Sequence, residues 1–341
     1  MDLSIIIPAF NAETYIKNCL SSLLNQQLDF DRFEVLVVND GSTDNTEELV
    51  KEVSKELSNF KVINQDNKGN GAARNTGIDA AKGQYIYFLD ADDYVAHNTL
   101  DKLLDIAMEN DLDVLGFKSK QVTDGLLVQS ENLKMDRPIS IINGREYIAN
   151  NNYKPEVWWY FTKRSFFLST KVRFYDRKFV QDSFITPSLF TKAEKIAYVD
   201  HDTHRYFQSP NSITRDKTGE HLKVHLRDIA FAVKKLDDLI QSIVAENALE
   251  NEKCLNTLKA KKESYVFVSI IRYIRSSLPY SNLLEGLEGF RKHEAYPLAH
   301  FLNITSYNTR INRLLVFIFN SRPLLYLSFR SYRFAKKFKG K

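Results

Sequence analysis

Apolar residues occur in blocks along the first 117 residues, and the blocks differ in their spacing. Continuous β-branched and aromatic runs predict buried strands, which we place at residues 3–7, 33–38, 60–63, 85–89 and 114–117. Between them, apolar residues at helical spacing predict helices that begin near residues 16, 44, 71 and 100. Strands that alternate with helices and are apolar throughout are typical of a mostly parallel sheet covered on both faces. This pattern predicts an α/β fold.

The rest of the chain shows two other patterns. Residues 118–150 are polar and irregular, and residues 153–213 are aromatic and polar with weak periodicity. We interpret them as a second half of the same domain that shares the sheet. From residue 220 onward helical spacing returns. We therefore place domain boundaries so that the parts are residues 1–117, 118–215 and 216–341.

Composition is ordinary for a globular protein, because 43% of the 341 residues are hydrophobic and 26% are charged. The two cysteines indicate no disulfide framework and fit a reducing compartment. The N-terminus lacks the basic and apolar segments of a secretory signal. No apolar run approaches the roughly 20 residues that span a bilayer. We therefore expect a cytoplasmic protein without a transmembrane helix.

The net charge of +4 is small, but the charge is unevenly distributed. No acidic residue follows Glu294, whereas nine arginines and lysines lie between residues 310 and 341. Leucines and aromatic residues interleave with them, which is typical of a basic amphipathic helix at an anionic membrane surface. Two alternatives stay open: helices that pack on the preceding domain with a solvated basic face, and nucleic-acid binding. We favour the membrane and expect no nucleic-acid partner.

Two carboxylates separated by one alanine, Asp90 and Asp92, follow the apolar run at residues 85–89. Ligands of open α/β sheets bind at the carboxyl ends of the strands. Hard divalent cations bind carboxylate oxygens and often share them with substrate phosphates. The pair therefore predicts a site where a metal holds a diphosphate. A turn whose acids cap the next helix is the alternative, and the pair alone does not decide between the two.

Two further positions suit a nucleotide. Asp40 follows the second strand, where its carboxylate is placed to accept a hydrogen bond from a base N–H. Arg74 lies in a helix of small residues that pack closely on a sheet, which directs its fixed donors into a restricted space. The alternatives are an ordinary strand-to-helix turn for Asp40 and a surface ion pair for Arg74.

The segment after the first strand excludes two common nucleotide-binding motifs. Residues 8–13 lack the glycines of a dinucleotide site and the Gly-Lys-Ser/Thr of a P-loop.

Taken together, four segments resemble the inverting glycosyltransferases of family 2, which have the GT-A fold. The matching segments, in order along the first third of the chain, are residues 5–11, 38–44, 67–77 and 88–93. The resemblance implies a GT-A-like, mostly parallel central sheet flanked by helices, with a helical C-terminal extension. It also implies that residues 1–117 bind the nucleotide sugar, residues 118–215 bind the acceptor, and residues 216–341 form the extension with its basic tail.

The resemblance implies a donor site at the matched positions. The implied donor-binding residues are Pro8, Phe10, Glu13, Asp40, Asn67, Gly69, Arg74, Asp90, Ala91 and Asp92. The first three would line the nucleotide pocket, and Asp40 and Arg74 would read the base. Asp90 would lie near the ribose, and Asp92 would be the ligand of a Mn²⁺ or Mg²⁺ ion that bridges the diphosphate. Asp93 is expected to cap a helix.

Inverting transfer also needs a base that takes the proton of the acceptor hydroxyl. Family members usually carry a Glu-Asp pair followed by an aromatic residue, and the matching residues here are Gln181, Asp182 and Phe184. The resemblance implies that Asp182 is the base, while Gln181 has no acid role. A helix cap is the alternative for Asp182.

Four residues are predicted on the acceptor side, and they are Trp158, Trp159, His204 and Arg205. The tryptophans lie in a segment that resembles the family's aromatic acceptor segment, although they suit a core equally well. The other two begin a segment, residues 204–213, that resembles the family's closing loop.

The resemblance therefore implies a metal-dependent glycosyltransferase of the hexosyltransferase type. It would use a nucleoside diphosphate sugar, with UDP favoured, and a saccharide or polyprenyl-linked saccharide acceptor in cell-surface polysaccharide synthesis. We expect it to be peripheral on the cytoplasmic face of the membrane. One alternative is a nucleotidyltransferase, although residues 8–13 lack the glycine-rich basic loop of that class. The other is a non-catalytic nucleotide-sugar-binding module, which the departure at Gln181 keeps open.

Overall fold

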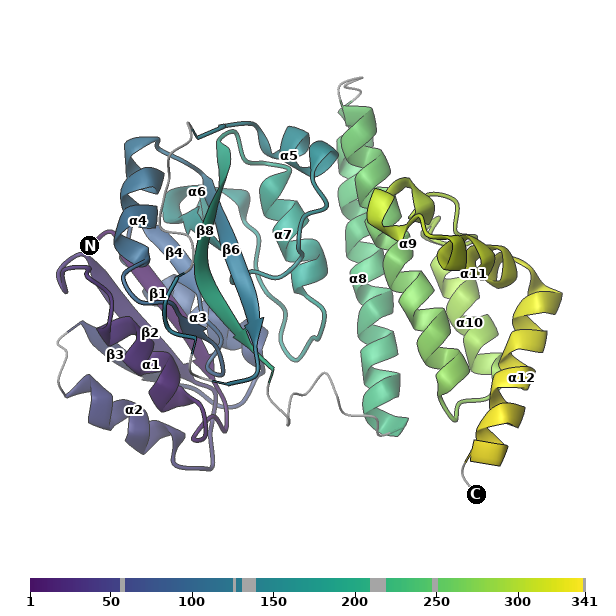
Figure 1. Cartoon of the computed structure of the whole chain (residues 1–341), viewed down its shortest axis with the longest axis horizontal. Helices are drawn as coiled ribbons and strands as arrows, with labels where there is room; N and C mark the ends of the chain where they lie inside the picture. Colours follow the sequence, from purple (N-terminus) through teal and green to yellow (C-terminus); the bar gives the residue numbers. More distant parts are fainter. Residues whose placement is uncertain (56–58, 125–126, 131–138, 209–218, 247–250, 340–341) are drawn as a thin grey trace. The chain divides into compact units, whose positions relative to one another are not determined.

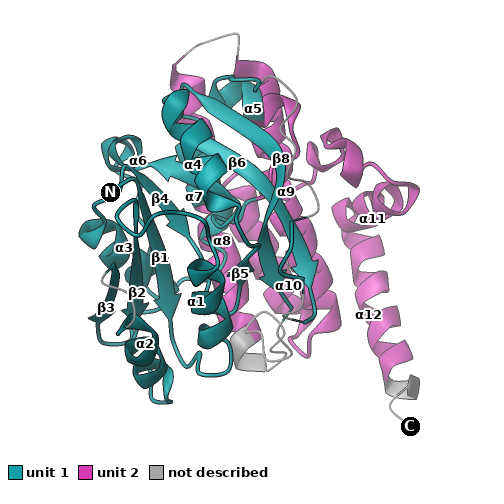
Figure 2. Cartoon of the chain, turned by 60° about the vertical axis from the view of Figure 1, so that its left-hand side comes forward, with its two compact units in different colours: residues 1–147, 155–213 teal, residues 148–154, 214–341 magenta. Residues whose placement is uncertain are grey.

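The computed structural model describes residues 1–55, 59–124, 127–130, 139–208, 219–246 and 251–339. The chain divides into two compact units, shown in separate colours in Figure 2. Unit 1 comprises residues 1–147 and 155–213, and unit 2 comprises residues 148–154 and 214–341.

Unit 1 contains a sheet of eight strands in the order β3-β2-β1-β4-β7-β6-β8-β5. Figure 1 labels β1 to β4, β6 and β8 of this sheet. The strands are β1 (Leu3–Ala9), β2 (Phe33–Asn39), β3 (Phe60–Asn64), β4 (Tyr85–Phe88), β5 (Tyr94–Val95), β6 (Val114–Val122), β7 (Tyr160–Lys163) and β8 (Ile196–Phe207). The helices up to residue 190 are α1 (Ile16–Leu24), α2 (Thr46–Ser54), α3 (Asn70–Ala80), α4 (Leu100–Glu109), α5 (Gly144–Asn150), α6 (Arg164–Thr170) and α7 (Asp182–Phe190).

The sheet is mixed. Strand β1 is parallel to β2 and β4, and β2 is parallel to β3, so the N-terminal half has the predicted parallel arrangement. Strand β7 is antiparallel to both β4 and β6, and β8 is parallel to β6. The second, aromatic half of the domain therefore continues the same sheet. Strand β7 joins the two halves because it lies between β4 and β6.

Both faces of the parallel half are covered, because alternate residues of a strand point to opposite sides of a sheet. Leu3, Ile5 and Ile7 share one apolar cluster with residues of α1 and α4. Ile6 faces α3, where a Cβ atom added to Gly77 would lie only 2.3 Å from Cγ2 of Ile6. Helix α3 thus packs closely on the sheet, as its small residues predict.

Unit 2 is helical, as predicted for the C-terminal part. Its main elements are α8 (Gly219–Ala245), α9 (Glu252–Arg275), α10 (Tyr280–Arg291), η3 (Phe301–Asn303), η4 (Thr305–Tyr307), α11 (Arg310–Asn320) and α12 (Arg322–Lys339). Helix α9 carries buried charges that are paired: Nζ of Lys262 lies 2.7 Å from Oδ1 of Asp237 on α8. Unpaired buried charges are costly, so such pairs fix the register of the helices. Among the described helices, none is both long and apolar enough to cross a membrane.

Candidate active site

The carboxyl ends of β1, β2 and β4 lie at one edge of the sheet, because these strands are parallel. Ala9 and Asn39 form the last register pair of β1 and β2, so Phe10 and Asp40 leave the two strands side by side. Asp90 follows β4 at the same edge. This edge is where open α/β sheets bind their ligands.

The guanidinium of Arg74 joins two carboxylates that are far apart in the sequence. Its Nη2 donates to Oδ1 of Asp90 at 2.8 Å, and its Nη1 donates to Oδ1 of Asp182 at 3.3 Å. Arg74 is only 4% exposed, and it lies over the rings of Phe88 and Phe174. Burial lowers the pKa of Arg74, but the two carboxylates outweigh it, so the net shift of the pKa is upward and the group stays charged. Arg74 therefore brings the predicted donor acid and the predicted base together.

Asp182 is the first residue of α7 and remains partly exposed. Burial raises the pKa of Asp182, Arg74 opposes the increase, and Asp90 and Glu156 add to it, so that the pKa is about 6. A carboxyl group with this pKa is ionised at neutral pH and is a stronger proton acceptor than an ordinary aspartate.

Asp92 follows Asp90 by two residues and has a different environment. Burial raises the pKa of Asp92 to about 7, with further contributions from the charges of Asp93 and Asp90. No side chain among the described residues forms a hydrogen bond or ion pair with its carboxylate. Burial and like charges disfavour the ionised form of such a carboxyl group, and a bound cation stabilises that form. Asp92 thus fits the predicted metal ligand, although no group of three or more His, Cys, Asp or Glu in the described chain is arranged to hold a metal unaided.

Asp93 does not cap a helix, so that prediction is wrong. Its Oδ1 accepts from the backbone N–H of Phe207 at 2.8 Å, and its Oδ2 lies 3.0 Å from Nε2 of His204. The following helix, α4, begins only at Leu100. Asp93 instead fixes the end of β8 against the turn that carries Asp92.

Asp40 is buried, and its carboxylate is used by the protein itself. It accepts hydrogen bonds from Nε2 of Gln65 at 2.7 Å, from the N–H of Lys68 at 2.9 Å and from the N–H of Gly69 at 2.7 Å. Gly69 has a φ of +90°, which glycine adopts at little cost. Asp40 therefore holds the loop that precedes α3 and carries Asn67.

The segment after β1 is bound to the neighbouring loop after β2. Oδ1 of Asn11 accepts from the N–H of Thr43 at 2.9 Å, and Oε2 of Glu13 accepts from the N–H of Asn45 at 3.1 Å. Phe10 has an exposed ring and Glu13 is also exposed, while Pro8 and Ala91 are buried. Of the predicted pocket residues near β1, Phe10 and Glu13 are thus the ones whose side chains are accessible to a ligand.

The four predicted acceptor-side residues lie in the interior of unit 1. Trp158 stacks on His204 with ring centroids 4.4 Å apart, and Trp159 packs against other aromatic rings. Arg205 is fully buried and forms two hydrogen bonds with Asp202, at 2.8 and 3.0 Å. This arrangement gives the four side chains a structural role, and their contact with an acceptor stays a prediction. Residues 209–213 of the predicted closing loop lie outside the described residues.

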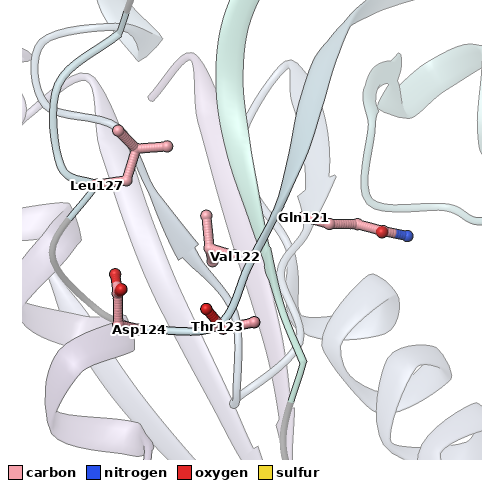
Figure 3. A pocket seen from close by; sticks show the side chains of 5 residues that line it. All are labelled: Gln121, Val122, Thr123, Asp124 and Leu127. Atoms are coloured by element: carbon pink, nitrogen blue, oxygen red, sulfur yellow. The ribbon is translucent and has the colours of Figure 1, made fainter.

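A hollow of about 430 Å³ lies at the end of β6 (Figure 3). Its described lining residues are Gln121, Val122, Thr123, Asp124 and Leu127. Val122, the last residue of β6, pairs with Phe207, the last residue of β8. The N–H of Phe207 donates to Asp93, so this end of β8 is bound to the turn that carries Asp92. None of the acidic site residues is among these lining residues.

Comparison with solved structures defines the class of the fold. Residues 1–349 of TarS from S. aureus, solved in complex with UDP-GlcNAc, match with a TM-score of 0.57 and 20% identity over 86% of this chain and 90% of that one. Unit 1 is accordingly a GT-A-like glycosyltransferase fold. The chain itself belongs to glycosyltransferase family 2, because the family model "Glycosyl transferase family 2" matches residues 4–183.

Two relatives show the range of similarity. The uncharacterized glycosyltransferase EpsJ of Bacillus subtilis (strain 168) is 34% identical over 239 residues, which are 67% of this chain and 69% of EpsJ. The poly(ribitol-phosphate) beta-glucosyltransferase of Bacillus spizizenii is 29% identical over 256 residues, which are 74% of this chain but only 38% of that protein.

Proposed function

We propose that this glycosyltransferase moves a hexose, with inversion, from a nucleoside diphosphate donor to a hydroxyl of a saccharide or polyprenyl-linked saccharide in surface-polysaccharide synthesis. The observation that carries the proposal is the bridge by which Arg74 joins Asp90, on the donor side, to Asp182. UDP is the favoured nucleotide, and the TarS neighbour holds UDP-GlcNAc. The relative that glucosylates poly(ribitol phosphate) supports a hydroxyl group on a polymer as the acceptor.

Asp182 is proposed as the general base. Inversion requires that the acceptor oxygen attacks from the side opposite the leaving diphosphate, and the base must remove the hydroxyl proton on that side. Asp182 is ionised above pH about 6, and its second oxygen is free of the Arg74 contact. Arg74 is buried and hydrogen-bonded to the carboxylates of Asp90 and Asp182. It is therefore proposed to hold these carboxylates in place rather than to recognise the nucleotide base.

Asp92 is proposed as the protein ligand of a Mn²⁺ or Mg²⁺ ion, with the donor diphosphate completing the coordination. When bound, such an ion supplies positive charge that stabilises the departing diphosphate. The carboxylate of Asp92, which has no side-chain partner within the described part of the chain, fits this role, because its ionised form is disfavoured by burial and by two acidic neighbours. Asp40 would then keep the loop before α3 in shape for the nucleotide, and Phe10 would contact the nucleotide with its exposed ring.

The proposed activity is tested by incubating the protein with UDP-, GDP- and dTDP-sugars, Mn²⁺ and a panel of saccharide acceptors. We expect donor-dependent release of the nucleoside diphosphate and a rise in melting temperature with one diphosphate and Mn²⁺ together. Binding without turnover over the whole panel would favour the binding module instead. Release of pyrophosphate from a nucleoside triphosphate and a sugar phosphate would favour the nucleotidyltransferase.

We also propose that unit 2 docks the protein on the cytoplasmic face of the membrane through α11 and α12. The two helices have an inner and an outer apolar face. On the inner face Phe319, which is 2% exposed, packs on Phe267 of α9 with ring centroids 5.3 Å apart, and Leu325 and Phe329 are also buried. The helices are therefore a folded part of unit 2.

The outer face of α11 and α12 has the composition of an interfacial helix. Its large apolar side chains are exposed, and they are Ile311, Leu314, Phe317, Leu327 and Phe334. Arg310, Arg313 and Arg330 are exposed on the same helices, and no acidic residue follows Glu294. Apolar side chains that insert below anionic headgroups, with arginines at headgroup level, are the two contributions to interfacial binding.

Replacing Phe317 with aspartate is expected to weaken binding to anionic vesicles about tenfold or more, because the ring is 65% exposed and free to insert. Co-sedimentation with phosphatidylglycerol-containing and pure phosphatidylcholine vesicles measures the effect. The matched control is Phe30→Asp, which changes a 51% exposed phenylalanine of unit 1. Failure of the wild type to bind the anionic vesicles, or binding of Phe317→Asp as tight as that of the wild type, would contradict membrane docking through these helices.

A further inference from the structure

The segment that carries Asp182, residues 174–182, has an unusual backbone. Arg177 has a φ of +49° and Val180 a φ of +60°. A β-branched residue rarely adopts this left-handed conformation, and it persists only where surrounding contacts hold it. The contacts that hold the base-carrying segment therefore decide where Asp182 lies.

The side chain of Gln181 closes this segment on itself. Its Oε1 accepts from the N–H of Tyr175 at 2.5 Å, and its Nε2 donates to the carbonyl oxygen of Lys178 at 2.8 Å. Gln181 is buried, and its own carbonyl oxygen accepts the N–H groups of Phe184 and Ile185 in the first turn of α7. One side chain thus defines both the approach to Asp182 and the start of its helix.

The same segment is bound to the loop that Asp40 holds, residues 67–71, which we call the nucleotide loop. The N–H of Arg177 donates to the carbonyl oxygen of Lys68 at 2.9 Å, and Nη2 of Arg177 donates to the carbonyl oxygen of Asn67 at 2.8 Å. A Cβ atom added to Gly71 would lie 2.4 Å from Nε2 of Gln181, so the amide packs directly against the end of this loop. The nucleotide loop and the base-carrying segment are in contact along their length.

We infer that Gln181 is a positioning residue that places Asp182 and couples it to the nucleotide loop. The inference rests on the proposed function of Asp182 as the base. Displacements of about 1 Å can cost a hundredfold in rate, so a residue that fixes the base affects turnover without touching the substrate. A ligand that orders the nucleotide loop would, through Arg177 and Gln181, also order the base.

The amide is the group that this arrangement requires. Gln181 uses one donor and one acceptor, and an ionised glutamate has no donor for the carbonyl oxygen of Lys178. A glutamate would also bring a second negative charge next to Asp182.

The test is Gln181→Glu, with Gln84→Glu as the matched control because Gln84 is exposed at the start of β4. We expect kcat for sugar transfer to fall about a hundredfold and UDP affinity in calorimetry to change less than threefold. The acid limb of the pH–rate profile should move to higher pH, because the added carboxylate disfavours ionised Asp182. If Gln181→Glu keeps the kcat and the pH–rate profile of the wild type, the inference is overturned. It is also overturned if the variant loses UDP affinity and turnover equally while its pH–rate profile stays unchanged.

Arg177→Ala keeps the inference testable if Gln181→Glu does not fold, because the Arg177 side chain is exposed. It should lower kcat about tenfold at unchanged melting temperature, and an unchanged kcat would contradict the coupling. The same variants distinguish failure of the proposed function from failure of this inference. A fully active Asp182→Asn variant would show that Asp182 is not the general base, whatever the activity of Gln181→Glu. An inactive Asp182→Asn with a fully active Gln181→Glu would remove only this inference.

Discussion

Replacing Asp182 with asparagine is expected to lower the rate of sugar transfer by about 10³-fold, the size of a general-base contribution. The asparagine oxygen can still accept the hydrogen bond from Arg74, so the site keeps its shape while it loses the proton acceptor. UDP binding in the presence of Mn²⁺, measured by calorimetry, should change less than threefold. The matched control is Asp31→Asn, which alters an exposed aspartate of unit 1 and should leave transfer unchanged.

The pH dependence provides an independent check of the same residue. The pKa of Asp182 is raised to about 6, so the wild-type rate should fall as the pH drops through about 6 and the base becomes protonated. An ordinary aspartate would place this decline near pH 4. With Mn²⁺ kept saturating at every pH, so that protonation of Asp92 does not limit the rate, the residual activity of Asp182→Asn should lack the decline. Full activity of this variant, or a wild-type rate that is flat down to pH 4, would show that another group is the base.

Replacing Asp92 with asparagine is expected to lower transfer by about 10²–10³-fold and, unlike the change at Asp182, to weaken Mn²⁺-dependent UDP binding. The amide removes the anionic oxygen that pairs with the cation. UDP binding measured with a chelator present should be the same in the variant and the wild type. Calorimetric titration of Mn²⁺ in the presence of UDP measures the effect.

Metal binding at Asp92 should also depend on pH. The pKa of Asp92 in the metal-free protein is about 7, so Mn²⁺ must displace a proton below that pH. Apparent Mn²⁺ affinity should therefore rise between pH 6 and pH 8 and then level off. If Asp92→Asn keeps wild-type Mn²⁺-dependent UDP binding, the metal has a different ligand.

The difference between Asp92 and Asp93 shows why adjacent acids have separate roles. Both are disfavoured as anions by burial. Asp93 is enclosed by the N–H of Phe207 and by His204, whose Nδ1 in turn lies 2.8 Å from the hydroxyl oxygen of Tyr87. Asp92 has no such partner among the described side chains. The neighbouring acid is therefore used to fix the turn, and Asp92 is left for a ligand.

The fold of this chain is most predictable from sequence where the signal is local. The strands that end before Phe10, Asp40 and Asp90 were predicted to within a few residues, because continuous apolar runs mark strands buried on both faces. The family, the α/β fold and the helical C-terminal region are confirmed. Residues such as Gln65 and Arg177, which hold Asp40 and the base-carrying segment, had no signal of their own in the sequence.

The second half of the sheet is the part of unit 1 that leaves the weakest signal in the sequence. Strand β5, with only Tyr94 and Val95, is too short to leave a pattern, and β7 inserts antiparallel between β4 and β6. The aromatic segment gave no indication that His204 and Arg205 would be enclosed, because burial depends on which strands become neighbours. The C-terminal helices likewise showed one mixed stripe of apolar residues, and only packing on α9 separated the inner face from the outer one.

The strands and helices that alternate over the first 117 residues, apart from β5, were determined by the sequence alone, as were the family and the acids at the strand ends. Each of these depends on residues close together along the chain. The tertiary structure decided the partners: Arg74 bridges Asp90 and Asp182, Asp93 is paired with His204 while Asp92 has no side-chain partner among the described residues, and Gln181 holds the base-carrying segment. These pairings join residues that are distant in the sequence. The charge state and role of each side chain follow from its neighbours and its burial, which exist only after the chain has folded.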